Sequence, residues 1–342
     1  MNMAGIDVAN ETFDVQKRCG ETITYRTFSN SPSGHQKVME WLKLGSEQVR
    51  VCLEATGIYH LQLALALFRT PGIELMVLNP RAARRFAEAQ MVRGKTDKVD
   101  ALVLLHYLER MRFVPWHAPS EQHLILQSLT HRLSQLTKEQ VRERSRLHAA
   151  ERAGPHTHEA QNDIQVHLRF LQRRHRQLEA KAIALMQQQP VMAQELELVD
   201  TVPGFAQSSA MHVLAEVGVL PDHLEPQQWV AQAGLDPKPT ESGTSVHSPR
   251  HISKQGNAKL RAALFFPAMV ACRCDPNVRA FYEKLLARGK PKRSAQTAVM
   301  RKLLHSIWGI LKYRQPWDGD KFYRMPVANN PGLPIEYLQK CQ

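Results

Sequence analysis

Two kinds of hydrophobic pattern alternate in the first quarter of the chain. Short stretches of alternating or continuous apolar residues, such as residues 3–8 and 49–54, are typical of β-strands. Between them, apolar residues recur at helical spacing, as in residues 34–44. The predicted strands are residues 3–8, 13–16, 22–28, 49–54 and 74–78, and the predicted helices are residues 34–44 and 59–69. Strands that alternate with helices favour an α/β layer sandwich.

Beyond residue 80 the pattern is almost entirely helical. Two long amphipathic stretches, residues 121–152 and 164–189, flank a Gly-Pro pair and predict an antiparallel helical hairpin. A further helical region, residues 196–311, is interrupted by a glycine-containing irregular segment at residues 234–256. A proline-bearing stretch at residues 113–119 predicts a linker before the first long helix.

The charge of the chain indicates the kind of partner it binds. Its 342 residues include 45 Lys and Arg against 32 Asp and Glu, which gives a formal net charge of +13. Such an excess indicates a polyanionic partner, because Lys and Arg neutralise phosphates and release counterions. The 43% hydrophobic content excludes a mainly disordered protein. No run of about 18 apolar residues is present, and we expect a cytoplasmic protein without a membrane span or secretory leader.

Four acidic residues stand where their side chains can converge. Asp7 and Glu54 each end a predicted strand, so both are expected at one edge of the sheet. Asp97 and Asp100 are three residues apart and project from one face of a helix. Their oxygen ligands favour Mg²⁺ or Mn²⁺. Taken singly, each acid also fits a structural role as a turn residue, a strand-end charge or a helix N-cap.

Four motifs, three of which contain these acids, resemble in order and spacing the DEDD transposases of bacterial insertion sequences. They are GIDVA at residues 5–9, LEATG at 53–57, NPR at 79–81 and KTDKVDA at 95–101. That family includes the Piv-type DNA invertases and the bridge-RNA-guided recombinases. The resemblance covers most of residues 1–315, although the helical hairpin is matched in character alone.

The resemblance implies a domain organisation and a metal site. The expected parts are an α/β ribonuclease-H-like (RuvC-like) domain at residues 1–118, a long antiparallel helical hairpin of coiled-coil type at 119–192, a mostly α-helical transposase domain at 193–315 and a surface tail at 316–342. The implied catalytic acids, which bind Mg²⁺ or Mn²⁺, are Asp7, Glu54, Asp97 and Asp100.

A second candidate site lies in the irregular segment. The sequence ESGTS at residues 241–245 is followed by ISKQGN at 252–257, with nearby cations that can hold a phosphate or assist attack by serine. Taken alone, the Ser-Gly pair also fits an ordinary turn. The resemblance implies that Ser242 is the nucleophile toward DNA. The candidate nucleic-acid contacts are Lys95, Arg142, Arg146, Arg250, Lys254 and Arg261.

The resemblance therefore implies an insertion-sequence transposase or recombinase that cuts and rejoins DNA through the acids and the serine. Its implied partners are donor and target DNA, a guide (bridge) RNA from the element and further copies of the chain in a dimer or tetramer, at the bacterial nucleoid. Two alternatives stay open. One is a metal-dependent, structure-selective DNA nuclease of the Holliday-junction-resolvase type, in which water attacks. The other is a nucleic-acid binder whose acids are structural.

Overall fold

The computed structural model describes residues 1–55, 57–91, 94, 96–221, 223–238, 241–242, 246–247 and 251–325 of the chain. The chain divides into two compact units, Met1–Ala118 and Pro119–Gln342. Each unit has its own buried hydrophobic residues.

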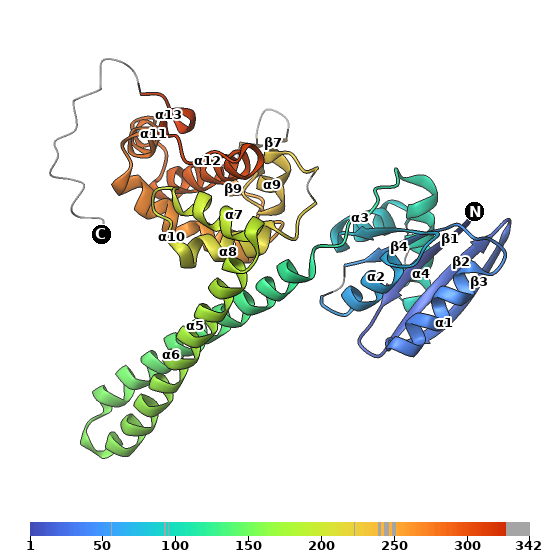
Figure 1. The fold of residues 1–342 in the computed structure, drawn as a ribbon, viewed down its shortest axis with the longest axis horizontal. Helices are drawn as coiled ribbons and strands as arrows, with labels where there is room; N and C mark the ends of the chain where they lie inside the picture. Colours follow the sequence, from blue (N-terminus) through green and yellow to red (C-terminus); the bar gives the residue numbers. More distant parts are fainter. Residues whose placement is uncertain are drawn as a thin grey trace. The chain divides into compact units, whose positions relative to one another are not determined.

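The first unit is built on a five-stranded mixed sheet (Figure 1). Its strands are β1 (Asn2–Val8), β2 (Thr12–Cys19), β3 (Thr22–Ser29), β4 (Val49–Glu54) and β5 (Ile73–Leu78), in the order β3-β2-β1-β4-β5. Its helices are α1 (Pro32–Lys43), α2 (His60–Phe68), α3 (Pro80–Ala89) and α4 (Asp97–Arg110). Neighbours among β1, β2 and β3 are antiparallel, whereas β4 pairs in parallel with both β1 and β5. This arrangement is consistent with the expected ribonuclease-H-like fold.

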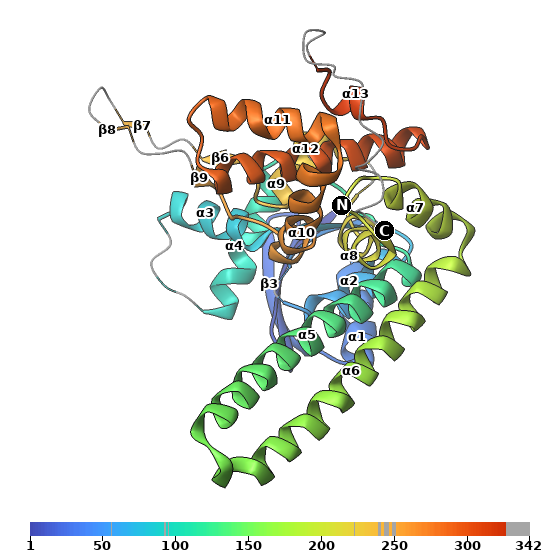
Figure 2. The same cartoon turned by 90° about the vertical axis from the view of Figure 1, so that its left-hand side faces the viewer.

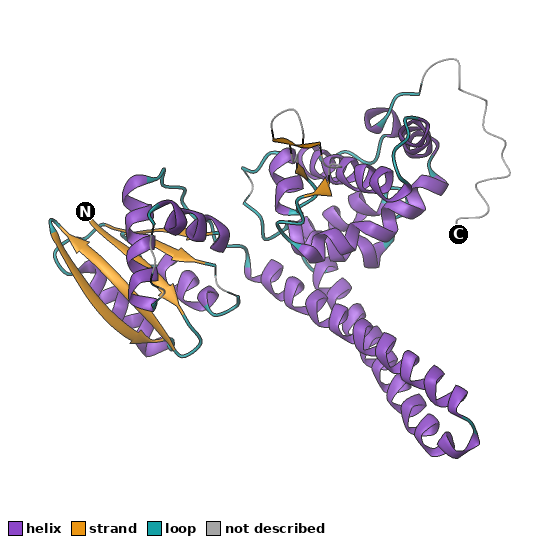
Figure 3. Cartoon of the chain, turned by 180° about the vertical axis from the view of Figure 1, so that it is seen from behind, coloured by secondary structure: helices purple, strands orange, loops and turns teal. Residues whose placement is uncertain are grey.

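Helices cover both faces of this sheet (Figure 3). Successive side chains of a strand point to opposite faces, so Ile6 and Leu53 pack on one side with Leu63 of α2. Cys52, the neighbour of Leu53, packs on the other side with Leu104 of α4. The unit is therefore a three-layer sandwich, with α1 and α2 on one face and α3 and α4 on the other.

The backbone of α4 lies directly on β1 at Gly5. A Cβ atom at this position would lie 2.2 Å from both the carbonyl oxygen of Ala101 and the backbone nitrogen of Leu105. The buried side chain of Gln16 on β2 fastens the same helix, because its Nε2 donates to the carbonyl oxygen of Lys98 at 3.2 Å. These contacts fix the start of α4 beside the end of β1.

The second unit is helical apart from short strands in its described part (Figure 1). Its elements are α5 (Glu121–Ala153), the 3-10 turn η1 (Pro155–Thr157), α6 (His158–Gln187), α7 (Pro190–Asp200), α8 (Gln207–Val217), α9 (Pro226–Gln232), β6 (Pro237–Lys238), β7 (Glu241–Ser242), β8 (Val246–His247), β9 (His251–Ile252), α10 (Ala258–Cys274), α11 (Pro276–Ala287), α12 (Lys292–Tyr313) and α13 (Gly319–Phe322). One large core joins these helices, with residues such as Leu214, Leu264 and Leu303 fully or almost fully buried.

Helices α5 and α6 form an antiparallel pair that continues beyond that core (Figure 2). Leu133 and Met186 belong to the core. Farther along the pair Leu168 and Leu171 of α6 are buried. Glu143 is buried beside them, and its Oε1 lies 2.5 Å from Arg146 Nη1 and 3.6 Å from His167 Nδ1 of α6. The distal part of the pair is therefore held partly by charged side chains.

The predicted helices and strands are largely confirmed. Strand β2 is longer than predicted, because its polar residues contact helices rather than water. Gln16 and Arg18 contact α4, and Lys17 Nζ donates to the carbonyl oxygen of Trp41 in α1 at 2.8 Å. Helix α6 begins at His158, before the predicted residue 164. The prediction missed its first turns because their residues are mostly exposed and carry no apolar spacing. No helix in the described ranges is both long and apolar enough to cross a membrane. The division of residues 119–342 into a hairpin, a catalytic part and a tail stays a prediction.

Candidate active site

The four predicted acids lie on the face of the sheet that α4 covers. Asp7 is the second-last residue of β1 and Glu54 is the last residue of the neighbouring strand β4. Asp97 and Asp100 occupy the first turn of α4, which begins after the N-cap Thr96. The parallel pairing of β1 with β4 and the close contact of α4 with β1 therefore bring three separate chain segments to one place.

The pKa of Asp7 reflects how near these acids lie to one another. Burial, followed by the negative charges of Asp100, Glu54, Asp97 and Asp14, raises the pKa of Asp7 to about 6. Carboxylates affect one another in this way only when they are close together. All four predicted acids thus share one electrostatic environment, and Asp14 joins them.

Asp14 is a fifth acid that the sequence pattern did not reveal. It pairs with Asp7 across β1 and β2 and is 5% exposed. Its Oδ1 accepts hydrogen bonds from Tyr25 Oη at 2.5 Å and from Thr27 Oγ1 at 2.6 Å. The hydrogen bond to Asp14 raises the pKa of the Tyr25 hydroxyl. Asp14 is thereby held in one orientation on the same face as Asp7.

The chemistry of these side chains suits a divalent cation. Carboxylate oxygens are hard ligands of the kind that Mg²⁺ and Mn²⁺ prefer, and a cation would relieve the repulsion that raises the pKa of Asp7. Across the described residues, no group of three or more His, Cys, Asp or Glu has the arrangement of a metal site. The acids therefore suit the ion in their chemistry and lie near one another. In the described part of this structure they are not arranged as a set of ligands around one point.

The serine segment belongs to the second unit. Its described residues form two pairs of short strands, which we call the ribbon. β6 pairs with β9, and β7 pairs with β8, both antiparallel. Ser242 lies on β7, with its backbone opposite that of Val246. The Ser242 side chain lies outside the described part, as do Arg250 and Lys95.

The chain on either side of this ribbon is fastened together. Residues 253–261, which follow β9, contact residues 232–236, which precede β6, and we call this contact the clasp. Three backbone hydrogen bonds form it: Ser253 N–H to Asp236 O at 2.8 Å, Lys254 N–H to Gly234 O at 3.0 Å and Asn257 N–H to Gln232 O at 2.6 Å. Gly256 has a φ of 154°, and a Cβ atom there would lie 2.1 Å from the carbonyl oxygen of Gln232.

The predicted nucleic-acid contacts have different surroundings. The guanidinium of Arg261 is engaged within the clasp, since its Nη1 donates to the carbonyl oxygens of Ala233 at 2.7 Å and Gly256 at 3.4 Å. Lys254 and Arg142 are exposed, and Arg146 is exposed while paired with Glu143. Nucleic-acid binding by any of them stays a prediction.

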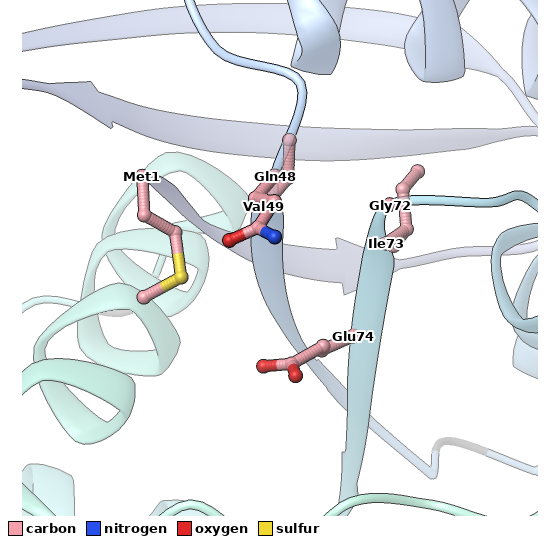
Figure 4. Close-up of a pocket in the computed structure, with 6 residues that line it drawn as sticks. All are labelled: Met1, Gln48, Val49, Gly72, Ile73 and Glu74. Atoms are coloured by element: carbon pink, nitrogen blue, oxygen red, sulfur yellow. The ribbon is translucent and has the colours of Figure 1, made fainter.

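A cavity of about 240 Å³ lies elsewhere in the first unit (Figure 4). It is lined by Met1, Gln48, Val49, Gly72, Ile73 and Glu74. These residues lie at or just before the first residues of β1, β4 and β5, whereas Asp7 and Glu54 lie at the opposite ends of their strands. The cavity therefore plays no part in the acid site.

Comparison with known proteins matches both units. A family described as a transposase, the DEDD transposase of IS110 type, matches residues 4–153. The transposase IS116/IS110/IS902 family matches residues 196–283. The pilin gene-inverting proteins of Moraxella bovis and Moraxella lacunata are each 26% identical to this chain over 318 residues, which is 92% of this chain and 97% of those proteins. An uncharacterized 43.6 kDa protein of insertion element IS110 from Streptomyces coelicolor is 30% identical over 155 residues, or 45% of this chain and 36% of that protein.

The acid-bearing sheet and the helical second unit together define a DEDD transposase. Specifically, the chain belongs to the IS110 family of insertion-sequence transposases. Membership implies an enzyme that binds DNA and transfers phosphoryl groups during recombination, in a family that typically uses a divalent metal ion.

Proposed function

We propose that this transposase cuts DNA at a metal site formed by Asp7, Glu54, Asp97 and Asp100 on a RuvC-like domain, and that Ser242 is its nucleophile. The position of Asp7 and Glu54 near the ends of neighbouring strands, beside the first turn of α4, carries the proposal for the metal site, and the raised pKa of Asp7 supports it. The clasp supports the proposal for the serine, because it holds the two ends of the Ser242 ribbon together.

The proposed chemistry conserves the energy of the phosphodiester bond. When bound, Mg²⁺ or Mn²⁺ supplies positive charge against the phosphate oxygens. The Ser242 hydroxyl loses its proton and bonds to phosphorus, while the bond from phosphorus to one deoxyribose oxygen breaks and that oxygen takes up a proton. The hydroxyl of another strand then attacks the phosphoserine and regenerates the free serine. Rejoining needs no external energy source, because the ester replaces the bond that was cut.

The proposal extends to the partners of the reaction. The Moraxella relatives are named as proteins that invert a pilin gene, which supports recombination between two DNA sites. We further propose a bridge RNA from the element as guide, and a dimer or tetramer as the working form. The net charge of +13 and the exposed arginines of α5 and α6 supply charge for both nucleic acids.

A search for a covalent protein–DNA adduct tests the chemistry. The protein is expressed with its flanking DNA present, and adducts are resolved on a denaturing gel. Wild type and the control Ser245→Ala are expected to form the adduct, whereas Ser242→Ala and Asp100→Ala are expected to lose it. The control Asp163→Asn, which changes an exposed acid of α6, should leave it intact. An adduct that persists in Ser242→Ala contradicts the serine mechanism.

The alternative function is a metal-dependent, structure-selective nuclease. One observation favours it: all four acids belong to the first unit. An activated water would then attack in place of serine. Strand cutting that depends on Asp100 but leaves no adduct, and that survives in Ser242→Ala, would establish this function instead.

A further inference from the structure

The clasp is anchored to the interior of the second unit by one buried acid. Glu216 of α8 is 3% exposed, and three side chains from other elements contact it. Its Oε1 lies 2.7 Å from His131 Nε2 of α5. Its Oε2 accepts hydrogen bonds from Asn257 Nδ2 at 2.5 Å and from Gln127 Nε2 of α5 at 3.4 Å. A buried carboxylate persists only with such partners.

Asn257 connects this acid to the clasp. Its backbone N–H makes one of the clasp hydrogen bonds, to Gln232. Its side-chain oxygen caps α10, accepting from the N–H groups of Lys259 at 2.9 Å and Leu260 at 3.1 Å. Since the same carboxamide donates to Glu216, one side chain fixes the start of α10, the end of the clasp and their distance from α8.

The ISKQGN motif that follows the serine is accounted for by these contacts. Ser253 Oγ donates to Asp236 Oδ1 at 2.5 Å, Gly256 allows the close approach to residue 232, and Arg261 binds the backbone on both sides. These groups hold the two ends of the ribbon together, whereas Lys254 of the same motif is exposed. The motif builds a base for the ribbon on which Ser242 lies.

We propose that Glu216 and Asn257 are positioning residues for the Ser242 ribbon, with Glu216 acting through the carboxamide of Asn257. This inference rests on the proposed role of Ser242 as nucleophile. A substitution far from the chemistry that displaces a reacting group by about 1 Å can lower the rate of a reaction about 100-fold. Weakening the hydrogen bond between the two side chains should therefore slow attack on DNA without weakening the binding of DNA.

A polarity swap tests the pair. Glu216→Gln replaces the charged acceptor of the Asn257 carboxamide with a neutral amide oxygen, which weakens this hydrogen bond, and Asn257→Asp puts two carboxylates face to face. In the double variant the new amide at position 216 donates to the new carboxylate at position 257, which still caps α10, since Asp is as good an N-cap as Asn. Glu283→Gln, at an exposed site on α11, is the matched control.

The rate of adduct formation is measured beside the affinity for DNA and the melting temperature. Each single variant is expected to lose about tenfold or more in rate while its affinity for DNA stays close to that of wild type. The double variant is expected to recover most of the rate. A single variant with the rate of wild type overturns the proposal, and so does a double variant as slow as the singles.

Hydrogen exchange of residues 251–261 separates this inference from the serine mechanism. The N–H groups of Ser253, Lys254 and Asn257 are hydrogen-bonded in the clasp, so their protection is expected to fall in each single variant and return in the double variant. Unchanged protection overturns the positioning role. If wild type forms no adduct, the proposed function fails, and this pattern of exchange still decides whether the pair holds the clasp.

Discussion

The pKa of Asp7 reflects the crowding of carboxylates at the acid site. It lies one strand away from Asp14 and Glu54 and beneath the first turn of α4. In the unfolded chain its pKa is near the ordinary value of 3.8, whereas in the folded protein burial and its neighbours raise it to about 6. Between these values the folded state binds the proton more tightly, so the free energy of unfolding falls as the pH rises through this window.

The substitution Asp7→Asn removes this dependence. In a metal-free buffer the variant is expected to exceed wild type in stability by about 1 kcal/mol at pH 7.5, after allowance for solvent screening. Well below pH 3.8 the two should be equal, since Asp7 is then protonated in both states. Urea unfolding across this pH range measures the difference.

Metal addition provides the second half of that test. Mg²⁺ at pH 7.5 is expected to stabilise wild type, because a ligand that binds the folded state raises its stability, and to leave Asp7→Asn unchanged. The exposed control Asp163→Asn should respond to Mg²⁺ as wild type does. An equal response in Asp7→Asn would show that the ion binds elsewhere.

The four acids were predictable from the sequence, whereas Asp14 and Glu216 were not. Asp7 and Glu54 stand at strand ends and Asp97 and Asp100 at a helix start, which are local features. Asp14 alternates with apolar residues along β2, a pattern typical of a strand with one face in water. The contact of α4 with that face of β2 buries Asp14. Pairings over long sequence separations, such as that of Glu216 with His131, leave no local pattern.

At the scale of elements, the position of α4 decides whether the acids meet. The helix contacts β1 backbone to backbone at Gly5, and Gln16 fastens its first turn. The sequence predicted a helix here, and it contains a glycine two residues before Asp7. The reason for the glycine is a contact between elements that only the fold shows.

A methyl group at position 5 is expected to push α4 away from β1. We expect Gly5→Ala to lower the free energy of unfolding by about 1–3 kcal/mol and to abolish stabilisation by Mg²⁺, because Asp97 and Asp100 move with the helix. Thermal unfolding with and without Mg²⁺ measures both effects. Gly309→Ala in α12, where a Cβ meets nothing within 4 Å, is the control and is expected to be neutral or to stabilise by up to about 1 kcal/mol. Equal behaviour of the two variants would refute the contact.

At the scale of the molecule, the positive charge is the dominant property. The acids lie in the first unit and Ser242 in the second, so the proposed reaction needs residues of both. The net charge of +13 favours binding of DNA, and such binding weakens steeply with salt as counterions return.

Arg142→Ala tests whether α5 takes part in this binding. Removing one phosphate contact is expected to reduce the slope of log K against log salt by about 1, uniformly across DNA sequences. Arg50→Ala is the control, because Arg50 Nε is bound to Glu74 Oε2 at 2.6 Å. Fluorescence anisotropy at several salt concentrations gives both slopes, and equal slopes for wild type and Arg142→Ala would place the contact elsewhere.

The antiparallel pair of α5 and α6 can be shortened without disturbing the core. α5 has 33 residues and is therefore about 50 Å long. Its part near Leu133 is fixed in the core, while the part around Glu143 combines charged contacts with the buried Leu168 of α6. Deleting seven residues from each helix beyond the core removes about two turns, or about 10 Å, and keeps the facing sides in register. If nucleic acid runs along the pair, the shortened protein is expected to protect about three base pairs fewer in a footprinting experiment. An unchanged footprint would show that it does not.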